Sequence, residues 1–208
     1  MLAIFKREFK SYFQNVIGWL FVAALLAVYG LYFYVYNLKN GYPYISYDLK
    51  GIGFIMMIAV PILTMRSLSD EKKTKTDQLM LTSPVSVGKI VAGKYFAMAA
   101  VYTIDIALFA LSPLVLSIYG KVALSEAYVA LFGYWLYGLS CIAVGLFISS
   151  ISESVIISAI LTFAALFLSY MMQSITGLIS SSGHLLTKVL HCFDLYTPFE
   201  NFVSGCFS

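Results

Sequence analysis

The sequence alternates between long apolar runs and short polar segments. Five apolar runs approach or exceed the length that a helix needs to cross the hydrocarbon core of a bilayer. They cover residues 16–36, 51–65, 91–119, 127–149 and 154–175. We therefore predict an all-α integral membrane protein, in which residues 1–208 form a single polytopic bundle of transmembrane helices.

Residues 1–14 have a different pattern. Large apolar side chains repeat at helical spacing on one face, and mainly basic side chains occupy the other. The apolar face holds Leu2, Phe5, Phe9, Tyr12 and Phe13, and the polar face holds Lys6, Arg7, Lys10 and Gln14. This amphipathic pattern predicts an interfacial helix that lies on the membrane with its basic face towards anionic headgroups.

A polar segment at residues 66–90 separates the second and third apolar runs. With the residues that follow, it contains six of the thirteen basic residues: Arg66, Lys72, Lys73, Lys75, Lys89 and Lys94. Ser67 and Asp70 have the spacing of a capping box, and the acidic start favours a helix N-terminus. Because Pro84 would end such a helix, we predict one helix from Asp70 to about Leu81.

The far end of this predicted helix carries exposed apolar residues. Leu79, Met80 and Leu81 lie outside every predicted span. Large apolar side chains at the tip of a polar loop indicate a surface that binds a partner protein. The alternative is that they lie back on the membrane interface.

Composition limits what this chain does alone. It is 61% hydrophobic and 11% charged, and no segment provides the roughly 50 residues that a separate soluble domain needs. Any ATPase or receptor must therefore be another chain, and we expect no nucleic-acid partner. With the amino terminus in the cytoplasm, nine basic residues are cytoplasmic and four are outside: Lys39, Lys50, Lys121 and Lys188. This asymmetry predicts a multi-pass cell-membrane protein with a cytoplasmic amino terminus.

The polar segment also carries a family resemblance. Its signature is Glu71, Thr76, Leu79, Leu81, Thr82, Ser83, Pro84, Val85 and Ser86, followed by residues 90–94. These residues resemble the permease subunits of ABC-2 type transporters, and the gliding-motility-type branch is the most similar. One departure is that the family usually has glycine before the threonine, where this sequence has Lys75.

The resemblance implies an architecture and a set of partners. The polar segment would be a cytoplasmic coupling helix that docks in a groove on an ABC ATP-binding subunit. The complete transporter would contain two such subunits and a second permease subunit. ATP and Mg would bind those ATP-binding subunits, so this chain would need no cofactor or metal. Residues 7–13 resemble the amino-terminal elbow helix of the family, and residues 194–202, in the region 177–208, resemble its external hairpin. A sixth span is expected after the hairpin, so we expect the sequence to continue beyond Ser208.

We therefore predict the permease of an ATP-driven exporter, with no catalytic residues of its own. The alternative is a membrane scaffold that recruits a cytoplasmic partner without transporting anything. The residues expected to bind the ATPase are Asp70, Glu71, Lys72, Thr76, Leu79, Met80, Leu81, Thr82 and Pro84.

Asp105 is the single acid in the middle of a predicted span. An intramembrane carboxylate should face protein or water, and Tyr102 and Thr103 lie close enough in sequence to help satisfy it. It could line the translocation pathway or contact another subunit. It could also be a neutral, hydrogen-bonded packing residue.

Two motifs imitate enzyme signatures. Residues 88–95 nearly spell a phosphate-binding P-loop, but Tyr95 stands where the motif needs serine or threonine, and no buried strand precedes it. Ser140 lies in a sequence that resembles a membrane serine nucleophile, but both histidines, His184 and His191, fall outside the predicted spans. Neither motif supports an enzyme.

The predicted orientation can be tested by labelling. Cysteines introduced separately at Lys73 and Tyr44 should react with a membrane-impermeant reagent from opposite sides of the membrane, because these positions flank one predicted span. The measurement compares intact cells with inverted vesicles. Labelling of both positions from the same side would contradict the topology.

Overall fold

The computed structural model describes residues 2–42, 44–75, 86–119, 123–179 and 196–204. Every element within those ranges is helical, which confirms the predicted all-α class. Four stretches are long and apolar enough to cross a membrane, and Val155–Met171 is a shorter apolar stretch. The four are Val16–Lys39, Ile45–Lys73, Val87–Ile118 and Leu124–Ile151.

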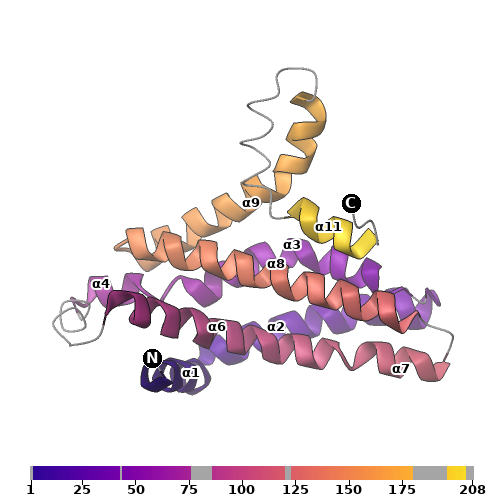
Figure 1. The fold of residues 1–208 in the computed structure, drawn as a ribbon, viewed down its shortest axis with the longest axis horizontal. Coiled ribbons are helices and arrows are strands. Elements are labelled where there is room, and N and C mark those ends of the chain that lie inside the picture. Colours follow the sequence, from indigo (N-terminus) through magenta and orange to yellow (C-terminus); the bar gives the residue numbers. More distant parts are fainter. Residues whose placement is uncertain (1, 43, 76–85, 120–122, 180–195, 205–208) are drawn as a thin grey trace.

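The long helices lie side by side around helix α3, Ile45–Thr64 (Figure 1). Helix α3 packs against α2 (Val16–Phe33), α8 (Leu124–Ile151) and α9 (Val155–Ile179). The buried core accordingly includes a continuous α3 stripe at Leu49, Ile52, Met56, Val60 and Leu63. Helix α3 is therefore the centre of the bundle.

Helix α1, Leu2–Gln14, has the bounds that its amphipathic pattern predicts. In Figure 1 it is seen end-on, whereas α2, α8 and α6 (Val87–Phe109) run across the picture. It therefore lies crosswise to the spans, at the same end of the bundle as α4 (Ser69–Lys73), and it packs against α6 and α2. This is the arrangement that an interfacial helix requires.

The second predicted span begins earlier than its sequence suggests. Helix α3 starts at Ile45, whereas the predicted span starts at Gly51. Buried Asp48 accepts a hydrogen bond from Asn37, and Lys50 pairs with Glu200 at 3.4 Å. Asp48 and Lys50, which precede the predicted span, thus have partners within the fold. Asn37 belongs to the π-helix η1, Tyr34–Lys39, which continues from α2.

The predicted third span, residues 91–119, is longer and interrupted. Helix α6 begins at Val87, ends at Phe109, and is followed by α7, Ser112–Tyr119. The interruption precedes Pro113, which has no N–H to donate to the preceding turn and disfavours helical backbone before it. The Ser112 hydroxyl donates to the carbonyl of Phe109 at 2.7 Å.

Small residues on α8 let neighbouring helices approach closely. A Cβ atom added at Gly138 would lie 2.3 Å from the Tyr102 ring of α6, and one at Gly145 would lie 2.5 Å from Thr64 Oγ1 of α3. Close approach at small residues is a common way for helices to pack in membranes. On α11, Tyr196–Ser204, the buried Tyr196 and Phe199 complete an aromatic cluster with α8.

Substitution of Gly138 tests this packing. Gly138→Ala should destabilise the protein by about 1–3 kcal/mol, because the added methyl group has no room beside the buried Tyr102 ring. Gly30→Ala is the matched control, since nothing lies within 4 Å of its new Cβ atom. Unfolding in mixed micelles, followed by circular dichroism, measures both. Equal stabilities would contradict the close approach of α6 and α8.

Candidate functional site

The predicted coupling helix is shorter than expected. Helix α4 ends at Lys73, so the prediction of one helix from Asp70 to Leu81 is wrong. The Thr74 hydroxyl donates to the Asp70 carbonyl at 2.8 Å, and Lys75 has a φ of 55°. That left-handed conformation cannot continue a right-handed helix. Lys75 stands where the family that this segment resembles usually has glycine, the residue that adopts positive φ most readily.

The start of α4 is held by another helix. The predicted capping box of Ser67 and Asp70 is wrong, because the helix begins at Ser69 and its N-cap makes no side-chain hydrogen bond. The N–H groups of Leu68 and Ser69 each donate to Ser149 Oγ at 3.2 Å. Ser149 lies in the last turn of α8. A side chain of α8 thus satisfies donors that an internal cap would otherwise bind.

Helix α4 in turn donates hydrogen bonds to carbonyl groups at the end of α8. Ser69 Oγ donates to the Ser149 carbonyl at 3.1 Å, and the Lys72 ammonium donates to the Ser150 carbonyl. Carbonyls in the last turn of a helix lack intrahelical donors, and the negative end of the helix dipole favours a cation there. Helices α4 and α8 therefore cap each other.

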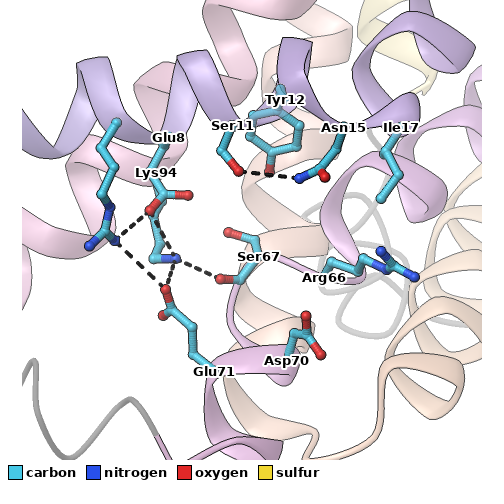
Figure 2. Close-up of a pocket in the computed structure, with 11 residues that line it drawn as sticks. Glu8, Ser11, Tyr12, Asn15, Ile17, Arg66, Ser67, Asp70, Glu71 and Lys94 are labelled. Atoms are coloured by element: carbon cyan, nitrogen blue, oxygen red, sulfur yellow. Dashed lines mark hydrogen bonds and ion pairs between the residues drawn. The ribbon is translucent and has the colours of Figure 1, made fainter.

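A buried lysine joins α4 to two further helices. Lys94 of α6 is only 2% exposed, and its ammonium lies 2.6 Å from Glu71 of α4. The same ammonium lies 3.7 Å from Glu8 of α1 and donates to the Ser67 carbonyl at 2.7 Å. Arg7 of α1 pairs with Glu8 at 2.7 Å. Figure 2 shows the contacts from Glu8, Glu71 and Ser67 converging on the Lys94 nitrogen.

The ion pairs among Arg7, Glu8, Glu71 and Lys94 form an ion network. This network lines one side of a cavity of about 470 Å³. Tyr12 of α1 faces the same space, and its hydroxyl lies 3.5 Å from the Leu63 carbonyl. Burial raises the pKa of the Tyr12 hydroxyl, the charge on Glu8 raises it further, and the nearby Ser67 hydroxyl opposes the rise. The hydroxyl therefore stays neutral and acts as a hydrogen-bond donor at physiological pH.

The position of Lys94 excludes the P-loop interpretation of residues 88–95. This segment is helical, whereas a P-loop wraps phosphates in an irregular loop, and the Lys94 ammonium binds carboxylates within the protein. No group of three or more His, Cys, Asp or Glu side chains gathers within the ranges that the structure describes.

The structure brings only part of the predicted site together. Glu71 and Lys72 contact the bundle, whereas Asp70 is exposed beside the cavity. The other predicted residues lie outside the described ranges: Thr76, Leu79, Met80, Leu81, Thr82 and Pro84. Sequence reasoning missed Lys94, Glu8 and Ser149. No local pattern in the sequence indicates these three residues, because the groups that they contact are distant in the chain.

Asp105 is fully buried inside the subunit. Neither carboxylate oxygen has a hydrogen-bond partner among the described residues. The expectation that Tyr102 and Thr103 would satisfy it is wrong, since the Tyr102 hydroxyl donates to the Tyr134 carbonyl at 2.7 Å and Thr103 to the Ala99 carbonyl. In this conformation a contact between Asp105 and another subunit would require the surrounding helices to separate.

The sequence was also compared with known families. The family model described as "ABC-2 family transporter protein" matches residues 30–204, which include α3, α4, α6 and α8. The chain belongs to this family. Comparison with curated proteins and with solved structures gives no match. The family match does not support the closer resemblance to the gliding-motility-type branch.

As an ABC-2 permease, the chain is a multi-pass membrane protein and a permease subunit of an ABC transporter. ABC ATP-binding subunits are partners of such permeases and carry the ATPase activity. The matched region contains Glu71, Lys94 and Ser149, whereas Arg7 and Glu8 precede it. The ion network thus links the matched region to the amphipathic helix before it.

Removal of the Lys94 charge tests the network. Lys94→Met should destabilise the protein by about 3–5 kcal/mol, because it leaves the carboxylate of Glu71 without its closest cation. The double substitution Lys94→Met with Glu71→Leu should recover part of this loss, since apolar groups can replace a buried ion pair. Reversible unfolding in mixed micelles measures each free energy.

Lys89→Met provides the control for Lys94→Met. Lys89 is exposed on the same helix, so its substitution should change stability by no more than about 0.5 kcal/mol. Equal losses for Lys89→Met and Lys94→Met would contradict a structural role for the buried ammonium.

Proposed function

We propose that this permease belongs to an ATP-driven exporter in which α4 transmits the closure of two separate ATP-binding subunits to the transmembrane helices. The observation that carries the proposal is the attachment of α4 to three helices at once. Glu71 binds Lys94 of α6 and lies beside Arg7 of α1, while Ser69 and Lys72 bind the end of α8. A displacement of α4 would therefore act on each of them.

The attachment suits transmission better than simple recruitment. A scaffold needs only an accessible docking loop, whereas here the side chains of α4 are bound to the ends of spans that surround the buried core. Coupling between sites requires a contiguous set of packed or bonded groups that can occupy two arrangements. The pairs Ser69–Ser149 and Glu71–Lys94 provide contiguous bonded groups from α4 to α8 and α6, and we propose that ATP binding shifts them to a second arrangement.

The ATP-binding subunits would dock on the residues after α4. We propose that Leu79 and Leu81 enter a groove on the ATPase, and that Thr76, Met80, Thr82 and Pro84 complete the contact. A second permease subunit would provide the other half of the pathway. Asp105 would line that pathway when the helices around it separate, because its carboxylate lacks partners inside the described bundle.

Ser149→Ala tests the proposed transmission without knowledge of the cargo. The substitution removes the hydroxyl that accepts the N–H groups of Leu68 and Ser69, so ATP binding should still alter α4 but reach α8 weakly. Backbone hydrogen exchange in the complex with its ATPase, with and without ATP, measures the ATP-dependent change in α4 and in α8. We expect the ATP-dependent change in α8 to fall by at least about half, a loss consistent with the removal of two modest hydrogen bonds.

Ser150→Ala is the matched control. Its hydroxyl bonds only within α8, to the Phe147 carbonyl at 2.6 Å, and Lys72 uses the Ser150 backbone carbonyl instead. An unchanged response in Ser149→Ala would remove this contact from the mechanism. If wild-type α8 shows no response to ATP although the ATPase remains bound, the scaffold alternative is favoured.

A further inference from the structure

The cavity beside the ion network is also lined by charged side chains that do not belong to the network. It is enclosed by α1, the start of α2, the α3–α4 connection, α4 and α6 (Figure 2). Its lining comprises Arg7, Glu8, Ser11, Tyr12, Asn15, Ile17, Arg66, Ser67, Asp70, Glu71 and Lys94. Three of these side chains are basic and three are acidic, so the lining as a whole is electrically neutral.

Two opposite charges in this lining have no ion partner. Arg7, Glu8, Glu71 and Lys94 pair with one another. Arg66 and Asp70 form no ion pair with any described residue, although both border the cavity. Figure 2 places Arg66 on the side away from the network and Asp70 between Glu71 and Arg66. The cavity thus offers one free cation and one free anion within the described part of the chain.

A buried hydroxyl group provides independent evidence for a ligand. Ser67 is 6% exposed and lines the cavity, and its Oγ atom makes no hydrogen bond within the described ranges. It lies near the Tyr12 hydroxyl but outside hydrogen-bonding geometry. Buried hydroxyl groups are nearly always hydrogen-bonded, because an unpaired one destabilises the fold. The Ser67 hydroxyl is therefore available to an oxygen atom of a bound molecule.

The cavity also lies at the level where lipid headgroups occur. Helix α1 lies crosswise to the spans and forms one wall, and Ile17, in the first turn of α2, forms another part. An interfacial helix marks the boundary between headgroups and acyl chains. A headgroup at this depth can enter the cavity while its acyl chains remain in the bilayer.

We propose that this cavity binds the headgroup of an aminophospholipid of the phosphatidylethanolamine class. The phosphate would bind the Arg66 guanidinium and the Ser67 hydroxyl, and the primary ammonium would donate to the Asp70 carboxylate. The neutral lining suits a zwitterion, whereas an anionic headgroup would leave Asp70 without a cation. A choline headgroup has no N–H group for Asp70. This inference does not depend on coupling to ATP.

Lipid competition on the full chain tests the proposal. The purified protein is incubated with equal amounts of phosphatidylethanolamine, phosphatidylcholine and phosphatidylglycerol that share the same acyl chains, and bound lipid is counted by native mass spectrometry. We expect about tenfold more phosphatidylethanolamine than either competitor, the effect of one charge-assisted hydrogen bond. This comparison needs no variant, so misfolding cannot obscure it.

Substitutions then assign the binding to the cavity. Arg66→Gln and Asp70→Asn should each reduce phosphatidylethanolamine retention about tenfold. Lys73→Gln is the control, because Lys73 is exposed on the same helix as Asp70 and does not line the cavity. Its retention should equal that of the wild type.

Five results would overturn the proposal. Equal retention of the three lipids would remove the selectivity, and a preference for phosphatidylglycerol would assign an anionic ligand instead. Retention that survives both Arg66→Gln and Asp70→Asn would place the lipid elsewhere. Displacement by water-soluble glycerophosphoethanolamine at equal concentration would indicate a free metabolite. Displacement by the ATPase subunit, with cross-links to Arg66, would assign the cavity to the protein partner.

Discussion

The burial of one ammonium group constrains the end of the bundle that carries α4. Lys94 is 2% exposed, and a charge in that environment is tolerated only if it is paired and hydrogen-bonded. Its partners come from three other segments: Glu71 from α4, Glu8 from α1 and the Ser67 carbonyl from the connection after α3. Each segment must keep its place for the charge to remain compensated. The interfacial helix, the central span and α4 are thus positioned by a single side chain of α6.

The second attachment of α4 depends on backbone groups instead. The last turn of α8 has carbonyl groups that need donors, and the first turn of α4 has N–H groups that need acceptors. The Ser69 hydroxyl donates to the Ser149 carbonyl, and the Ser149 hydroxyl accepts the Ser69 N–H. Gly145, one turn earlier on α8, lets that helix approach Thr64 at the end of α3. The close packing of α3 and α8 therefore brings the two complementary helix ends within hydrogen-bonding distance.

The sequence predicted what local patterns determine. Apolar length and amphipathic spacing predicted the long apolar helices and α1, because both depend on how nearby residues face lipid or water. The start of α3 could not be predicted this way, since Asp48 is tolerated there through Asn37. In the sequence, Lys94 was interpreted as a cytoplasmic charge, as part of the family signature and as part of a false P-loop, but not as a buried ion-pair partner. Its role depends on Glu71 and Glu8, which are near it only in the folded chain.

The shortness of α4 is itself informative. A helix of five residues gains too few backbone hydrogen bonds to form alone, so its geometry must come from tertiary contacts. Those contacts are directed to α6, α1 and α8, and they end where Lys75 adopts a left-handed conformation. The chain before Lys75 is therefore fixed to the bundle, and a right-handed helix cannot continue through that residue because its φ is positive.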